Sequence, residues 1–286
     1  MSRLPALLLV IGLLAAAGLW WLGGRLATGS PARVGSPPAY LPAKSIHIDS
    51  ASGSRLAGWY APGQVGRGGV LLLHGSGGDR RSMLGRARFL HRVGHAVLLI
   101  DFQAHGESPG PYNTLGYLEA RDAEAALDWL AQRLPGERLA IVGFSLGGAA
   151  PLLGKAAEAA DALVLEAVYT DLETAVGNRI ALRLGDVFRP LAPLLTLQYR
   201  PRMGFSSDEL APVERLGDLS TPLLIVGGEQ DLRATETDTR LLFATANEPK
   251  QLWLLPGATH QDFHAFTPRD YEQRVGGFLA RHLVAE

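Results

Sequence analysis

The fold of this chain is decided by the stretch Leu139-Ala140-Ile141-Val142-Gly143-Phe144-Ser145-Leu146-Gly147-Gly148. Its first four residues are apolar and predict a strand buried on both faces, and the helix-compatible residues 149–160 follow. A serine between a strand and a helix, with glycine two positions away on either side, is typical of a sharp turn. Such a turn strains the serine backbone and exposes its hydroxyl. We therefore predict that Ser145 is a nucleophile.

Similar apolar runs recur along the chain, separated by segments with helical periodicity. Strands that alternate with helices predict βαβ units and a mostly parallel sheet flanked by helices. Ligands of such sheets bind beyond the carboxyl ends of the strands, so the residues directly after each strand indicate function. The predicted strands are 46–48, 56–60, 69–73, 96–100, 139–142, 162–165, 223–226 and 252–255.

A serine hydroxyl is a weak nucleophile unless a base accepts its proton and a carboxylate orients that base. Asp231 and His260 each follow a predicted strand, in the order serine, acid, histidine that this kind of turn leads us to expect. Both would lie at the same sheet edge as Ser145, so we predict a triad of the three. His264 lies four residues after His260, a spacing that can bind a metal on a helix. No carboxylate-rich motif accompanies it, so we expect a surface or packing residue.

Other carboxylates compete with Asp231 for the acid position. Glu229 shares its loop, and Glu166 and Asp171 follow the predicted strand 162–165. We favour Asp231 and keep the other three as alternatives. The sequence has no P-loop, zinc motif or dinucleotide fingerprint, so we expect no cofactor and no metal.

Negative charge that develops on a reacting carbonyl oxygen needs two preorganised backbone N–H donors. One should be Leu146, directly after the serine at a helix N-terminus. The second is expected from the glycine-rich loop 74–78, because glycine accepts unusual dihedral angles and lets the backbone approach closely. We predict the Ser76 N–H, with Gly77 as the alternative. His74, at the strand end, is predicted to hydrogen-bond this loop in a structural role.

Taken together, five blocks resemble the α/β-hydrolase superfamily over about residues 44–282. The segment that begins at Asp101 has Gln103 and Ala104 where the family usually has Arg-Gly, in a part that is structural in the family. The run 163–167 and Pro222 are most similar to the serine aminopeptidase (S33)-like branch. The five blocks are the loop His74-Gly75-Ser76-Gly77, the segment 101–108, the turn 143–147, the Asp231 turn and the His260 loop.

The resemblance implies an α/β-hydrolase fold and two-step acyl transfer through an acyl-enzyme intermediate. We expect a serine hydrolase that cleaves acyl esters or thioesters of a small-molecule or lipid-like substrate. A peptidase or amidase is the alternative, because the same triad cleaves amides. A non-catalytic binding protein is disfavoured, because every expected catalytic position is filled.

The N-terminal run 4–24 has no charge between Arg3 and Arg25. Its length matches the ~20 residues that cross a ~30 Å hydrocarbon core as a helix. Trp20 and Trp21 near one end favour the membrane–water interface. We expect residues 1–27 to be an uncleaved membrane anchor.

A cleaved signal peptide is the alternative for this run, since Arg3 supplies a basic start and residues 15–17 are small alanines. A buried core helix is the third. The expected location is a bacterial inner membrane with an exported, periplasmic catalytic domain. After cleavage the protein would instead be periplasmic or secreted.

Composition excludes several classes of protein. Of 286 residues, 47% are hydrophobic and 19% are charged, with a formal net charge of −1. A disordered chain needs lower hydrophobicity and higher net charge, so this class is excluded. A nucleic-acid binder would show a basic stripe, and this sequence shows none. We expect a Pro/Gly-rich extended linker without packed structure over 28–43, and one hydrolase domain over 44–286. The apolar insertion at about 172–215 predicts a small helical lid, or an ordinary cap packed on the domain.

Overall fold

The computed structural model describes residues 4–284. Arg3, the basic start of the alternative signal peptide, therefore lies outside the described residues. Its sheet is built from β2 (Lys44–Asp49), β3 (Arg55–Ala61), β4 (Gly69–Leu73), β5 (Ala96–Ile100), β7 (Leu139–Phe144), β8 (Ala162–Glu166), β9 (Leu223–Gly228) and β10 (Lys250–Leu255). The spatial order is β10-β9-β8-β7-β4-β5-β3-β2. The six strands from β10 to β5 are parallel, and β3 pairs antiparallel with both of its neighbours.

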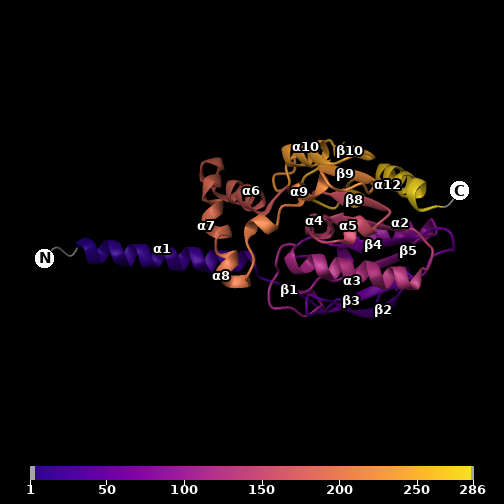
Figure 1. Cartoon of the computed structure of the whole chain (residues 1–286), viewed down its shortest axis with the longest axis horizontal. Helices are drawn as coiled ribbons and strands as arrows, with labels where there is room; N and C mark the ends of the chain where they lie inside the picture. Colours follow the sequence, from indigo (N-terminus) through magenta and orange to yellow (C-terminus); the bar gives the residue numbers. More distant parts are fainter. Residues whose placement is uncertain (1–3, 285–286) are drawn as a thin grey trace.

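Helices cover both faces of this sheet, because its central strands are apolar on both sides (Figure 1). One face packs against α3 (Tyr117–Arg133), α4 (Leu146–Leu153), α5 (Ala156–Ala159) and α10 (Glu236–Thr245). The other packs against α2 (Leu84–Arg92), α11 (Phe263–Phe266) and α12 (Pro268–Leu283). The predicted mostly parallel sheet flanked by helices is therefore confirmed.

Short helices occupy the long connection from β8 to β9. They are α6 (Leu172–Leu184), η2 (Asp186–Leu191), α7 (Ala192–Thr196), α8 (Tyr199–Met203), η3 (Ser207–Glu209) and α9 (Pro212–Leu216). The first of them have an apolar cluster of their own, which includes Leu172, Val176, Leu195 and Tyr199. The connection leaves the sheet at the carboxyl end of β8, the edge at which ligands of parallel sheets bind.

The N-terminal helix α1 (Leu4–Leu26) projects away from the rest of the chain (Figure 1). In the described part of the chain it is the one helix long and apolar enough to cross a membrane, with a mean hydropathy of 2.1 over Leu7–Arg25. A signal sequence has the same length and composition. Its exposed side chains exclude the third alternative, a buried core helix.

The segment after α1 is extended, but the expectation that it lacks packed structure is wrong. Within it, β1 (Ser30–Pro31) pairs in parallel with β6 (His105–Gly106), and Leu41 is only 2% exposed. Proline and glycine disfavour helices, but they do not prevent an extended segment from hydrogen-bonding to a neighbouring loop. The segment is thus fixed to the domain at β1 and at Leu41.

Candidate active site

Ser145 lies at the turn between β7 and α4 with the unusual backbone angles φ +52° and ψ −114°. A non-glycine residue rarely adopts a positive φ, and such strain persists only where the surroundings enforce it. The two glycines of the motif permit this turn. A Cβ on Gly143 would lie 2.1 Å from the Gly147 carbonyl oxygen, and a Cβ on Gly147 would lie 2.1 Å from the Leu73 carbonyl oxygen. The sequence motif is thus explained by close backbone approach.

Gly147→Ala should therefore destabilise the protein. The added Cβ meets the backbone of β4 rather than a flexible side chain, so the start of α4 must shift, and we expect a loss of about 1–3 kcal/mol in the free energy of unfolding. Chemical denaturation measures it. Gly217→Ala is the matched control, because its Cβ would meet nothing within 4 Å. Equal stabilities of the two variants would contradict this explanation.

Asp231 and His260 meet at the carboxyl ends of β9 and β10. His260 Nδ1 lies 2.7 Å from Asp231 Oδ2. The other oxygen of Asp231 accepts hydrogen bonds from the backbone N–H groups of Arg233 (2.7 Å) and Ala234 (3.0 Å), which fixes the carboxylate. Since Nδ1 donates to a carboxylate, Nε2 of the neutral imidazole is left as an acceptor.

Backbone hydrogen bonds join the loops that carry these three residues into one layer. The Ser145 N–H donates to the Glu166 carbonyl at the end of β8 (2.7 Å), and the Ala167 N–H donates to the Val226 carbonyl of β9 (2.9 Å). The Gln230 N–H donates to the carbonyl of Ala258, in the loop before His260 (2.9 Å). The His260 ring also lies 5.0 Å from the ring of Phe144, the residue directly before Ser145. All three predicted triad residues therefore lie along one edge.

The competing carboxylates are engaged elsewhere or face solvent. Glu229 is exposed, and Asp171 accepts a hydrogen bond from the Thr174 N–H at the start of α6 (2.7 Å). Glu166 is fully buried in an ion pair with Arg86. Burial alone would lower the pKa of Arg86, but the carboxylate of Glu166 raises it well above its usual value. The structure thus leaves Asp231 as the carboxylate that contacts His260.

Two further histidines have packing contacts. His264 stacks on Phe89, with ring centroids 5.6 Å apart. His74 is fully buried; its Nε2 accepts the Phe102 N–H (3.1 Å), so its Nδ1 donates to the Gly75 carbonyl (2.8 Å). Burial and the nearby His105 lower the pKa of His74 to about 3. Such a histidine stays neutral and orders the loop that follows β4. Among residues 4–284, no cluster of side chains suited to a metal ion is found.

One predicted N–H donor lies at the start of α4, and the other lies on the loop after β4. Leu146 is the first residue of α4, and the first N–H groups of a helix have no partner inside it. Ser76 is exposed on the loop after β4, where Gly77 has φ +80°. Asn113 Nδ2 donates to Ser76 Oγ (2.8 Å) and holds this loop. Sequence reasoning missed Asn113, because no motif links it to a residue 37 positions away.

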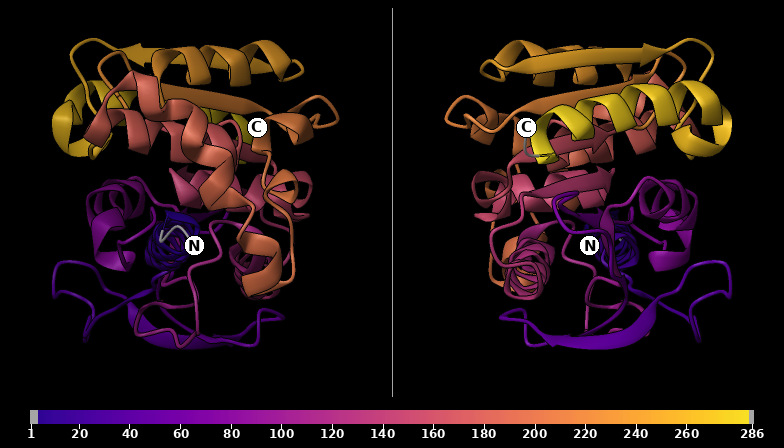
Figure 2. Two further views of the ribbon diagram at one scale, coloured as in Figure 1. Left: turned by 90° about the vertical axis from the view of Figure 1, so that its left-hand side faces the viewer. Right: turned by 90° about the vertical axis from the view of Figure 1, so that its right-hand side faces the viewer.

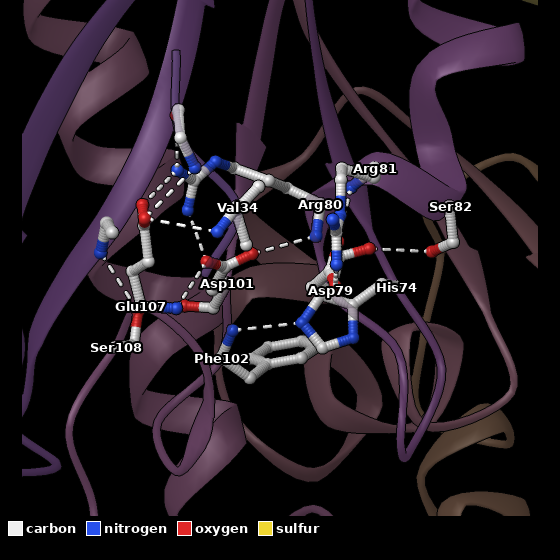
Figure 3. A network of polar contacts seen from close by, with 12 residues as sticks. Val34, His74, Asp79, Arg80, Arg81, Ser82, Asp101, Phe102, Glu107 and Ser108 are labelled. Carbon is white, nitrogen blue, oxygen red and sulfur yellow. Dashed lines mark hydrogen bonds and ion pairs between the residues drawn. The ribbon is translucent and has the colours of Figure 1, made fainter. Parts of the chain in front are cut away.

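A buried ion pair fixes the residues that follow this loop (Figure 3). Arg80 forms this pair with Asp101, and its backbone N–H also donates to Asp101 Oδ1 (2.7 Å). Ser108 Oγ donates to the Asp101 carbonyl (2.7 Å). The segment 101–108 therefore joins the loop after β4 to β5 in a structural role.

Glu107 extends this network to the segment after α1 (Figure 3). One of its oxygens accepts the backbone N–H groups of Val34 (3.1 Å) and Gly35 (3.0 Å), and the other pairs with Arg80 at 2.5 Å. The Gly35 backbone N–H and the Arg80 guanidinium lower the pKa of Glu107 to about 2. The carboxylate thus stays ionised and holds the segment after α1 through the hydrogen bonds at Val34 and Gly35.

A model of the alpha/beta hydrolase family matches residues 70–274, which include the predicted triad and N–H donors. The chain belongs to the alpha/beta hydrolase family. This α/β-hydrolase is 32% identical over 256 residues to an uncharacterised protein of Mycobacterium tuberculosis, covering 88% of this chain and 84% of that protein. It is 26% identical to the uncharacterised protein YfhR of Escherichia coli, covering 84% and 82%.

Among solved structures, this α/β-hydrolase is similar to the esterase Pf2001 of Pyrococcus furiosus. The TM-score is 0.71 at 23% identity, and the match covers 90% of this chain and 98% of that one. At this identity the likeness shows the fold alone. The family establishes a hydrolase, and membership of the serine aminopeptidase-like branch stays a prediction.

Proposed function

We propose that this α/β-hydrolase is a membrane-tethered serine hydrolase that cleaves acyl ester or thioester bonds. The observation that carries the proposal is the strained Ser145 turn, which shares a sheet edge with the hydrogen-bonded pair of Asp231 and His260. A strained backbone at a serine whose sheet edge also holds a base paired with a carboxylate fits acyl transfer.

In the first half-reaction, Ser145 Oγ attacks the acyl carbon while its proton passes to His260 Nε2. Asp231 holds the Nδ1 proton and stabilises the imidazolium that forms. The N–H groups of Leu146 and Ser76 stabilise the oxyanion. As the carbon–oxygen or carbon–sulfur bond breaks, the imidazolium gives its proton to the leaving alcohol or thiol. Water then attacks the acyl-enzyme by the same route and releases the acid.

Exposed apolar surface on α1 supports the tether. The side chains of Leu8, Leu9, Leu13 and Leu14 are each at least 60% exposed, which in water would be unfavourable. We propose that residues 1–27 anchor the enzyme in a bacterial inner membrane, with the domain from residue 44 on the periplasmic side. A cleaved signal peptide is the alternative, and N-terminal sequencing of the protein from both the membrane and the soluble fractions distinguishes the two.

The substrate class is tested with p-nitrophenyl esters of increasing acyl length and with matched p-nitroanilides, using the detergent-solubilised full chain. We expect the esters to be cleaved faster than the anilides and the rate to depend on acyl length. Faster cleavage of the anilides would favour a peptidase or amidase instead. Ester hydrolysis that is equal in wild type and in Ser145→Ala would refute the proposed site.

A further inference from the structure

The connection between β8 and β9 lies on the side of the domain from which α1 projects (Figure 2, left). It exposes a group of large apolar side chains. Val187 is 80% exposed and Leu197 is 71% exposed. Large apolar patches on a protein surface mark contacts with another protein or with a membrane. We call this group the lid edge; it consists of Leu182, Leu184, Val187, Phe188, Leu191, Leu194 and Leu197.

The C-terminal part of α1 is fixed to α8 and to Gln198 directly before it, which follow the lid edge. Gln198 Nε2 donates to the Leu19 carbonyl (2.9 Å), and the Arg202 guanidinium lies 3.7 Å from the centre of the Trp20 ring. A Cβ on Gly23 would come within 2.3 Å of Gln198 Oε1. This close approach sets the position of the lid edge relative to α1.

The length of α1 before its contacts with the domain determines how close the surface of a spanned bilayer lies to the domain. The described side chains between residues 7 and 18 are all exposed, and a Cβ on Gly18 would meet nothing within 4 Å. The helical backbone before the first contact at Leu19 runs from Leu4 to Gly18, which at 1.5 Å per residue is about 22 Å long. A hydrocarbon core is ~30 Å thick. If α1 spans the bilayer, about 8 Å more of the helix must lie inside the hydrocarbon core. That part of α1 lies alongside α7 and α8, so these helices would reach about 8 Å into the bilayer.

That depth is the ~5–10 Å to which apolar faces of interfacial helices enter a bilayer. Two exposed arginines, Arg183 and Arg200, accompany the apolar side chains. Arginine at such a surface favours contact with anionic headgroups. This proposal rests on the proposed tether: we propose that the lid edge inserts into the interface of an anionic phospholipid bilayer beside α1, so that the helices between β8 and β9 contact lipid.

The chain has no cysteine, so single cysteines can report the depth of chosen positions. We would introduce Leu197→Cys and Val187→Cys in the lid edge and Leu14→Cys in α1. Val65→Cys is the matched control, an apolar position that is 98% exposed and precedes the amino end of β4. Each full-length variant receives an environment-sensitive fluorophore and is reconstituted in vesicles of phosphatidylethanolamine and phosphatidylglycerol. Some vesicles contain lipids with a nitroxide on the acyl chain.

We expect the emission at positions 14, 187 and 197 to shift to the blue and to be quenched by the nitroxide, while position 65 stays unquenched. Quenching at 14 alone would overturn the lid-edge proposal and leave the tether standing. No quenching at any position would overturn both. A blue shift at 187 and 197 without quenching would mean that a second copy of the chain covers the lid edge, which also overturns the proposal. Ester hydrolysis, measured on the same samples, tests the chemistry separately.

Discussion

Ser145→Ala is expected to lower kcat for ester hydrolysis by about 10⁴–10⁶-fold, because triad enzymes lose rates of this order when the nucleophile is removed. The substitution removes one oxygen atom from a turn whose shape depends on Gly143 and Gly147, so the fold should be unchanged. Initial rates with a p-nitrophenyl ester measure the effect, and circular dichroism checks the fold. Ser36→Ala, at an exposed serine before the sheet, is the control and should keep the wild-type rate. A residual rate in Ser145→Ala within tenfold of wild type would contradict the proposed nucleophile.

Asp231→Asn should lower kcat by about 10⁴-fold, because it imposes the wrong tautomer on the histidine. In the wild type, the N–H groups of Arg233 and Ala234 donate to Asp231 Oδ1. The side-chain oxygen of the introduced asparagine can still accept both hydrogen bonds. The amide nitrogen then faces His260 Nδ1 and donates to it. The imidazole proton is thereby moved to Nε2, which can no longer accept the proton of Ser145.

The matched control for this variant is Glu229→Gln, an exposed carboxylate two residues earlier in the same loop. It should retain the wild-type rate, and the two variants should unfold at similar temperatures. If Glu229→Gln loses as much activity as Asp231→Asn, the carboxylate that orients His260 has been assigned incorrectly.

The sheet and the positions of the site residues could be predicted because each depends on a local pattern. An apolar run marks each strand, and the carboxyl ends of parallel strands share one edge. That geometry alone is enough to expect residues 145, 231 and 260 near one another. The strain at Ser145 was likewise predictable, because a serine between a strand and a helix, with glycine two positions away on either side, is typical of a sharp turn.

Features that depend on distant partners could not be predicted. The Arg86–Glu166 pair joins residues 80 positions apart, and the clamp from Glu107 to Gly35 joins residues 72 positions apart. The proline and glycine content of residues 28–43 predicts an extended backbone, but it does not indicate that the loop at 105–107 offers partners for it. The packing of α1 on Gln198 and Arg202 could not be predicted either, because these residues lie about 180 positions away in the sequence.

The central claim is that Ser145 is the one activated nucleophile of this α/β-hydrolase. It is tested most directly by treating the full chain with a fluorophosphonate and mapping the adduct by peptide mass spectrometry. We predict a single covalent adduct on Ser145, absent from Ser145→Ala and formed much more slowly in Asp231→Asn. An adduct on any other residue, or undiminished labelling of Ser145→Ala, would contradict the account.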